Sequence, residues 1–322
     1  MSTVRAIQID RLGREPSDTF PGTLLDSRHT LPTTSPTYRV LRRIRAEHPH
    51  LPIVISTGKQ HRSTAGLREQ LRLDGVFPSC HLNGNVLYDA AGNVVAASGL
   101  DVPVVLRVLE EMRATGTSTF VYDHTTVYQL GYAPDEWGHG ESGGGGCRWA
   151  ETLRGYGEDV VCIPPAEVES ALGRIARGEL TVVKMAICHD ASVVDGAYPP
   201  LRIPVADISQ ALKQHLIDTF PATAFAPTQA LPFCCELIPA KYNKGTALLQ
   251  CLQHMNSRGH DIKLENVIAF GDGENDISMF ALAGMSVAMG NAMDAARHAA
   301  KYVTGSNDDG GVGLFLERVI WG

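Results

Sequence analysis

An acidic turn at residues 271–276 combines residue types that can bind a cation. It reads Gly-Asp-Gly-Glu-Asn-Asp and follows four apolar residues that are typical of a buried parallel strand. The carboxyl ends of parallel strands border the crevice where such sheets bind ligands, and glycines allow the backbone to turn sharply there. Aspartate oxygens are hard ligands that suit Mg²⁺. Asp272 and Asp276 are therefore candidate metal ligands.

Two other interpretations of this turn use the same residue types. A polar turn that only caps the next helix would also contain aspartate, asparagine and glycine. A calcium loop of the EF-hand type fits less well, because Ile277 occupies the place of its invariant glycine. The residues at the ends of the other strands favour the metal site.

Polar side chains follow two further apolar stretches in the same way. Asp10 directly follows the stretch 4–9, and Thr57 comes two residues after the stretch 51–55. Lys244 begins a predicted helix, although the helix dipole makes a first turn locally positive and so disfavours lysine there. A phosphate held by a metal, a hydroxyl, helix amides and a lysine could be attacked by an aspartate to form an aspartyl-phosphate. The set predicts phosphoryl-transfer chemistry.

Alternating strands and helices are the elements that would bring these residues together. Apolar strands are predicted at 4–10, 51–58, 76–81, 267–270 and 285–289, with helices at 36–48, 61–73, 244–255, 293–300 and 313–319. The middle of the chain has a hairpin near 90–93, helices at 102–114, 167–177 and 208–219, and strands at 118–122, 126–130, 180–188 and 230–238. The pattern predicts an α/β fold: a doubly wound, Rossmann-like parallel sheet at 1–85 and 236–322, with an inserted α+β domain at 86–235.

Composition narrows the class of protein. The chain has 322 residues, 44% hydrophobic and 20% charged, and a formal net charge of −7, which gives no general attraction for nucleic acid or anionic membranes. Its seven cysteines form no C-x-x-C pair, so neither a zinc site nor a disulfide framework is expected. No segment approaches the length of a membrane helix, which favours a cytoplasmic protein. The histidines show no paired spacing, so His81 and the others are expected to be packed or exposed rather than ligands.

Several longer stretches then indicate a known family. They are GTLLDS, STGK, LNGNVLYD, ELIPAKYNKGTAL, FGDGENDISMF and the tail AGMSVAMGNAMDAARHAAKYVTGSNDDGGVG, together with the strand that ends at Asp10. These stretches resemble the haloacid dehalogenase superfamily and, within it, the Cof-type phosphatases with a large α/β cap. The resemblance covers most of the predicted core and implies an Mg²⁺-dependent phosphatase acting on a small phosphorylated metabolite, such as a sugar phosphate or nucleotide.

The resemblance also assigns roles to particular residues. It implies a nucleophile and metal ligand at Asp10, a stabilising cation at Lys244, the main Mg²⁺ ligand at Asp272, a further metal-site carboxylate at Asp276, a phosphate ligand at Thr57, and substrate-site residues at Gly58, Asn83 and Asn275. Asn83 would also mark the hinge of the cap. The 86–235 insert would then select the substrate, and no motif in it indicates which one.

The first motif of the family is interrupted in this chain. The family has an aspartate, any residue, a second aspartate that protonates the leaving group, and then Gly-Thr-Leu. Here position 12 is Leu12, and residues 11–21 separate Asp10 from Gly22. If Gly22 marks the motif instead, Thr19 and Pro21 occupy the two aspartate places. Whether 11–21 is a genuine insertion or a gene-prediction error stays open.

The interruption leaves three functions to distinguish. A phosphatase is the leading one, although the chain as written is expected to turn over poorly because a general acid contributes about 10² to 10⁴ in rate. A pseudo-phosphatase that binds phosphorylated ligands would follow from a genuine insertion. A sugar-phosphate phosphotransferase or mutase would use the same core but prefer a sugar acceptor to water. The sequence gives no indication of oligomeric state.

Overall fold

The computed structural model describes residues 6–9, 22–114, 117–131, 148–155, 157–188, 208–231 and 234–322. Asp10 and the interrupted segment 11–21 lie outside these described residues. The chain divides into two compact units, Met1–Ala96 with Tyr242–Gly322, and Ala97–Lys241. These limits fall further along the chain than 86 and 235, the boundaries expected from the sequence.

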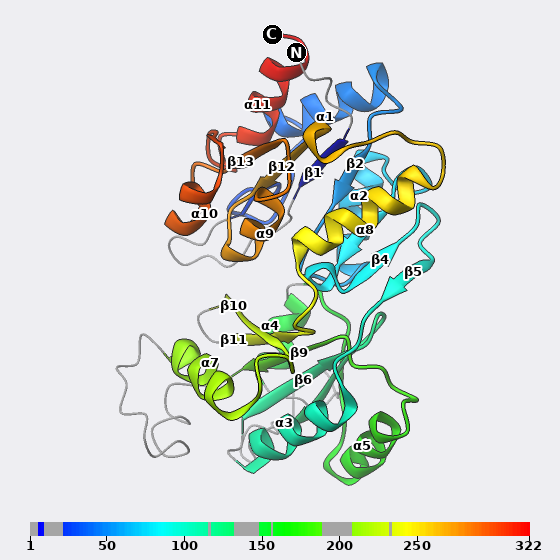
Figure 1. Cartoon of the computed structure of the whole chain (residues 1–322), viewed down its shortest axis with the longest axis vertical. Helices are drawn as coiled ribbons and strands as arrows, with labels where there is room; N and C mark the ends of the chain where they lie inside the picture. Colours follow the sequence, from blue (N-terminus) through cyan, green and yellow to red (C-terminus); the bar gives the residue numbers. More distant parts are fainter. Residues whose placement is uncertain are drawn as a thin grey trace. The chain divides into compact units, whose positions relative to one another are not determined.

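A parallel sheet forms the centre of the first unit (Figure 1). Its order is β14-β13-β12-β1-β2, with β1 at Ala6–Ile9, β2 at Ile53–Ile55, β12 at Val267–Gly271, β13 at Met285–Ala288 and β14 at Tyr302–Val303. Each of the pairings is parallel, and β1 lies between β12 and β2. The predicted α/β class is confirmed, and the strands β1, β2 and β12 are buried along their whole length, as expected for a parallel sheet covered by helices.

Helices of the first unit follow from amphipathic patterns and caps. They are α1 at Pro36–Glu47, α2 at Ala65–Leu71, α8 at Lys244–Asn256, α9 at Ile277–Phe280, α10 at Asp294–Ala299 and α11 at Gly311–Ile320. In α1, the Ser35 hydroxyl caps the start, and Val40, Leu41 and Ile44 are buried on one face. α1 packs closely on α11. Gly313 allows this approach, because a Cβ at that position would lie 2.5 Å from the carbonyl carbon of Pro36.

A small sheet of β3 (Ser79–His81), β4 (Val86–Tyr88) and β5 (Val94–Ala97) also belongs to the first unit. Strand β4 pairs antiparallel with β3, with Ser79 opposite Tyr88. The predicted turn near 90–93 joins β4 to β5, and the Asp89 carboxylate accepts bonds from the Ala91 and Asn93 amides. Because β4 pairs with β3 and β5 extends the same sheet, the hairpin stays with the first unit, although the sequence pattern placed it in the insert.

The second unit is an α+β structure around one mixed sheet. The strand order is β10-β11-β9-β6-β7-β8, at Ala226–Leu231, Cys234–Ile238, Lys184–Cys188, Ser118–Tyr122, Val127–Gly131 and Val160–Cys162. Its helices are α3 (Val102–Ala114), α4 (Arg148–Gly155), α5 (Val168–Ala176) and α7 (Ile208–Thr219). The single strand predicted at 230–238 is wrong: β10 and β11 are antiparallel neighbours. α4 and β8 were not predicted.

Side chains from α3, α5 and α7 pack with one face of this sheet in a single apolar cluster. Met185 and Ile187 of β9 and Cys235 and Leu237 of β11 occupy alternate positions on their strands and belong to that cluster. No helix among the described residues is long and apolar enough to cross a bilayer.

Candidate active site

The acidic turn leaves the end of β12 as the sequence predicted. Asp272 and Asp276 are both buried, with exposed fractions of 1% and 0%. The Asp276 Oδ2 atom accepts bonds from the Asp272 amide at 2.9 Å and the Gly273 amide at 3.0 Å. A Cβ at Gly271 would lie 2.4 Å from the Asp276 Cγ atom, so glycine is required for the turn to fold back on itself. Asp276 thus organises the turn from within.

Lys244 is the second buried charge of the site. Its Nζ atom lies 2.7 Å from Oδ1 of Asp276, and both side chains are fully buried. The start of α8 is fixed there by a capping box between Asn243 and Thr246 and by a bond from the Gly245 amide to the Ser278 hydroxyl on α9. The unusual first-turn lysine therefore has a specific carboxylate partner 32 residues away.

The two aspartates have different partners. Both oxygens of Asp276 accept hydrogen bonds, one from an ammonium and one from two amides, and its role as a metal ligand stays a prediction. Asp272 has a different partner, because its Oδ1 atom accepts a bond from the Thr23 hydroxyl. Among the described residues, no group of three or more histidine, cysteine or acidic side chains has the arrangement of a metal site.

Thr23 lies in the candidate site but was not among the site residues expected from the sequence. It lies in the Gly-Thr-Leu stretch after the interrupted segment, and it is 1% exposed. Two asparagines fix this stretch: Asn291 Nδ2 donates to the Gly22 carbonyl at 2.9 Å, and Asn307 Nδ2 donates to the Leu25 carbonyl at 2.8 Å. The available signal was the family pattern, in which Gly-Thr directly follows the catalytic aspartates.

Thr57, Gly58, Asn83 and Asn275 also come together. Thr57 follows β2, and its carbonyl accepts the Asn83 amide at 3.0 Å. The Asn83 Oδ1 atom accepts from Asn275 Nδ2 at 3.3 Å, and a Cβ at Gly58 would lie 2.9 Å from that same oxygen. The structure therefore places the loops after β2 and β12 in contact through Asn83.

The strand register shows where the chain leaves the sheet. Ile9, the last described residue of β1, is opposite Phe270 of β12 and Ile55 of β2. The Asp272 turn and the Thr57 loop both start within two residues of these positions, at one edge of the sheet. Side chains from several strand ends can therefore act on one ligand, which is the usual place for a site in an open α/β sheet.

Comparisons with known proteins identify the family of the chain. The model of the haloacid dehalogenase-like hydrolase family matches residues 20–142 and 203–316. An uncharacterized hydrolase of Schizosaccharomyces pombe is 38% identical over 300 residues, which cover 92% of this chain and 88% of the relative. A pyridoxal phosphate phosphatase of Escherichia coli is 27% identical over 98% of both chains.

Solved structures show the same fold. A haloacid dehalogenase-like hydrolase from Bacteroides thetaiotaomicron has a TM-score of 0.71 and 21% identity, and it covers 99% of this chain and 100% of its own. The protein TM0651 of Thermotoga maritima has a TM-score of 0.70 over 98% of this chain and 97% of its own. This chain therefore belongs to the haloacid dehalogenase-like hydrolase family, and within it to the Cof-type phosphatases, which are phosphoric monoester hydrolases.

Proposed function

We propose that the protein is an Mg²⁺-dependent phosphatase that hydrolyses a small phosphorylated metabolite through an aspartyl-phosphate. The observation that carries the proposal is the buried Lys244–Asp276 pair beside Asp272, at the sheet edge where Thr57 also lies. A buried lysine with a fixed geometry is suited to stabilise the charge of a phosphoryl group. Named relatives act on pyridoxal phosphate and on a phosphoribitylamino-uracil, both small phosphorylated molecules.

The donor set fits a hard divalent cation. Asp272 offers a buried carboxylate at a strand end, and Asp10 follows β1, the strand next to β12. We assign these two residues as the carboxylate ligands and Asp276 as the residue that holds Lys244 and the turn. Mg²⁺ bound there would neutralise charge on the phosphate and orient it. The Thr23 hydroxyl on Asp272 Oδ1 would fix the orientation of that ligand.

The remaining residues bind and orient the phosphate. The Thr57 hydroxyl and the loop amides around Gly58 would donate to phosphate oxygens, and Lys244 would balance their charge. Asn83 and Asn275, which are bonded to each other, would keep the two loops at a fixed separation. The Asp10 carboxylate would attack phosphorus, and water would later hydrolyse the aspartyl-phosphate. The second unit, Ala97–Lys241, would be the cap that selects the substrate.

A pseudo-phosphatase is the second candidate, and the interrupted first motif favours it. Leu12 stands where the family has its general acid, and Thr19 and Pro21 replace the two aspartates if the motif is counted from Gly22. Loss of the acid alone would slow turnover by about 10² to 10⁴. Such a protein would still bind phosphorylated ligands with Mg²⁺, because the interruption leaves Lys244, Thr57 and Asp272 unchanged.

A repaired chain tests both candidates together. We expect the chain as written to hydrolyse p-nitrophenyl phosphate slowly, and a variant that lacks residues 12–20 and carries Pro21→Asp to be at least about 100-fold faster with Mg²⁺. Chelation with EDTA should abolish both activities. A matched control adds Asp10→Asn to the repaired chain and should be inactive. Repaired protein that is folded but inactive on a broad panel of phosphomonoesters would refute the phosphatase proposal.

A further inference from the structure

We propose that His81 is a positioning residue that fixes the loop carrying Thr57 and Gly58, and thereby sets the affinity of the site for phosphate. This inference rests on the proposed function of that loop. His81 was expected from the sequence to be an ordinary packed or exposed histidine. It is fully buried, at 0% exposure, on β3. Its ring is bonded at both nitrogens.

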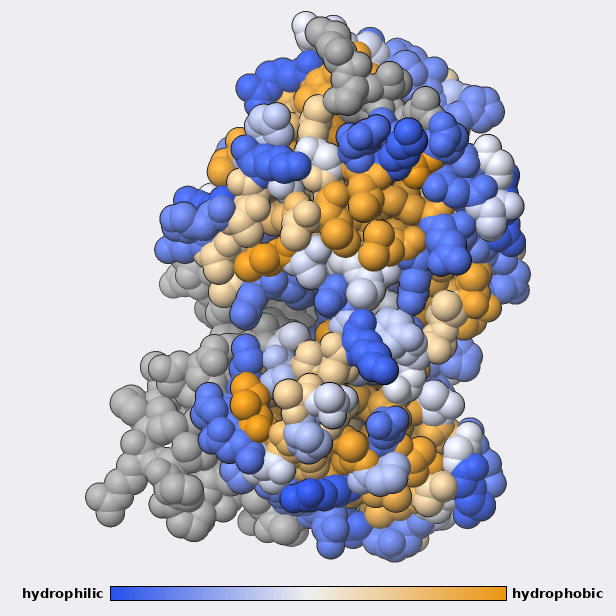
Figure 2. All heavy atoms as spheres, in the orientation of Figure 1, coloured by the Kyte–Doolittle hydropathy of each residue, from blue (hydrophilic) through white to orange (hydrophobic). Residues whose placement is uncertain are grey.

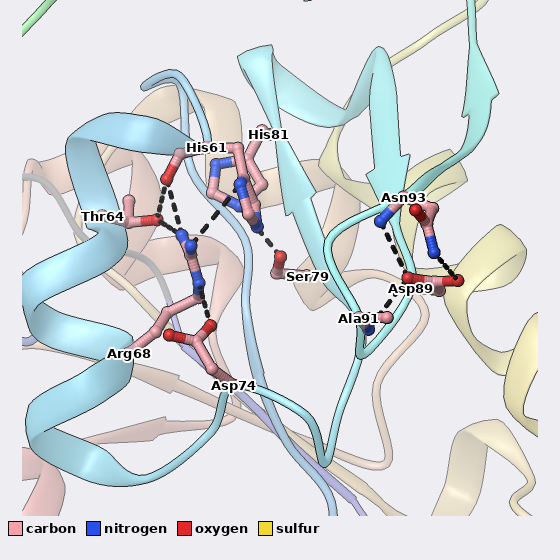
Figure 3. A network of polar contacts seen from close by, with 9 residues as sticks. All are labelled: His61, Thr64, Arg68, Asp74, Ser79, His81, Asp89, Ala91 and Asn93. Atoms are coloured by element: carbon pink, nitrogen blue, oxygen red, sulfur yellow. Dashed lines mark hydrogen bonds and ion pairs between the residues drawn. The ribbon is translucent and has the colours of Figure 1, made fainter.

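The two partners of the ring show what each nitrogen can do. His81 Nδ1 lies 3.1 Å from the Lys59 carbonyl oxygen, which can only accept, so Nδ1 carries the proton and donates. Nε2 lies 3.0 Å from the Ser79 hydroxyl, which can act as either donor or acceptor. Figure 3 shows Ser79 reaching the ring from the same strand. The ring thus has one defined donor toward a carbonyl, Nδ1, and that donor holds the backbone of the Thr57 loop.

Backbone bonds continue the same connection. Thr57 donates its amide to the Cys80 carbonyl at 3.0 Å, and its own carbonyl accepts the Asn83 amide at 3.0 Å. The Lys59 carbonyl, which His81 binds, also accepts the Leu82 amide at 3.2 Å. The loop 57–59 is therefore held along its length by residues 80–83, and the His81 ring supplies the side-chain bond at its far end.

A strained turn follows His81 and explains why such a bond is needed. Leu82 and Asn83 have left-handed φ angles of 53° and 60°, and Gly84 has a φ of 93°. A bulky leucine rarely adopts this conformation, so surrounding contacts must enforce it. A Cβ at Gly84 would lie 2.6 Å from the Asn243 carbonyl, so the turn is wedged against the start of α8, next to Lys244. The turn therefore connects the Thr57 loop to the lysine.

Neighbouring rings hold His81 in one orientation. It meets His61 and Tyr88 edge-on, with ring centroids 5.0 and 5.4 Å apart, and those two rings stack on each other at 4.1 Å. His61 Nδ1 lies 3.4 Å from Arg68 Nη2, as Figure 3 shows. His61 therefore packs in the same cluster but is bonded to Arg68 and not to the Thr57 loop. It provides a matched control.

The test compares substitutions that keep one ring partner at a time. In His81→Asn, the amide nitrogen can replace Nδ1 and still donate to the Lys59 carbonyl; in His81→Gln, the amide reaches toward Ser79 instead. We expect His81→Gln to weaken the binding of inorganic phosphate, measured by calorimetry with Mg²⁺, about tenfold, the value of about one hydrogen bond. His81→Asn and the control His61→Phe should remain within about twofold of the unchanged protein.

A second readout reports on the loop without any ligand. Amide exchange of residues 57–59 should become faster in His81→Gln and stay unchanged in His81→Asn and His61→Phe. Phosphate affinity and exchange rates that are equal in all three variants would overturn the positioning role. Equal loss of phosphate affinity in His81→Gln and His81→Asn would show that His81 has a purely structural role. Failure of the unchanged protein to bind phosphate would show that the proposed function of the site is wrong as well.

Discussion

Among the described residues, each unit contains one buried lysine–carboxylate pair, and the two pairs differ in what surrounds them. In the first unit, Lys244 and Asp276 are 2.7 Å apart and 0% exposed. In the second, Lys184 and Glu236 are 2.8 Å apart, with side-chain exposures of 2% and 8%. Burying two charges costs several kcal/mol per ion unless further bonds compensate. The further contacts therefore indicate what each pair is for.

The Lys244 pair is connected to backbone, and the Lys184 pair to an aromatic ring. Asp276 also accepts two amides of its own turn, so its charge shapes the candidate site. Lys184 Nζ lies 4.1 Å from the centroid of Tyr122, and burial raises the pKa of the Tyr122 hydroxyl well above its usual value. These residues alternate with the apolar ones that face α3, α5 and α7, so they lie on the opposite face of the sheet. The first pair therefore shapes the turn of the proposed site, and the second lies within a sheet.

The largest effect is expected from Lys244→Met. It removes the cation of the site and leaves a buried carboxylate without its ammonium, so phosphate hydrolysis by the repaired chain should fall by about 10² to 10³. Unfolding of the first unit should also become easier by about 3 to 5 kcal/mol. Steady-state kinetics and denaturant titration measure the two effects. A variant that kept more than a tenth of the activity would show that Lys244 has only a structural role.

The second pair should respond in stability alone. Lys184→Met should lower the free energy of unfolding of the second unit by about 3 to 5 kcal/mol, because Glu236 then stays buried without the ammonium. The double variant Lys184→Met with Glu236→Leu should recover to within about 1 kcal/mol of the original, since apolar replacements of buried pairs are often neutral. Phosphate affinity should stay unchanged in both. A loss of phosphate affinity in Lys184→Met as large as that in Lys244→Met would contradict the division of roles.

A smaller effect is expected where Asp272 meets Thr23. Thr23→Val removes the hydroxyl that donates to Asp272 while keeping the shape of the side chain. The Mg²⁺ concentration needed for half-maximal phosphate binding should rise about tenfold, as for other residues that orient a metal ligand. Thr23→Ser keeps the hydroxyl and serves as the control. An unchanged Mg²⁺ requirement in Thr23→Val would argue against Asp272 as the metal ligand.

The smallest effect concerns His61, a partly buried histidine beside Arg68. Burial and the nearby Arg68 lower the pKa of His61 from 6.5 to about 4. Between these values the unfolded chain binds a proton that the folded protein does not, so stability decreases as pH falls from about 6.5 toward 4. The free energy of unfolding should therefore be lower at pH 5 than at pH 7, and less so in His61→Phe. An NMR titration of His61 with a pKa near 6.5 would contradict this.

Local patterns were sufficient to predict most of the first unit. Helix 36–48 appears as α1 at Pro36–Glu47, helix 244–255 as α8 at Lys244–Asn256, and the apolar run before Asp272 as β12. Periodicity succeeds here because it records which face or end of an element is buried. It failed at 230–238, where one strand was predicted and the structure has the end of β10 followed by β11. It also missed the short elements α4 and β8, whose patterns are too brief to be distinctive.

The sequence by itself determined which residue types stand at the ends of the parallel strands, and so placed Asp272, Thr57 and Lys244 in one candidate site. The tertiary structure alone decided their partners. It directs both oxygens of Asp276 to Lys244 and the turn amides, brings the Thr23 hydroxyl to Asp272, and makes His81 a donor to the Lys59 carbonyl. Such bonds join residues up to 249 positions apart, and they depend on how loops pack, which no local pattern records.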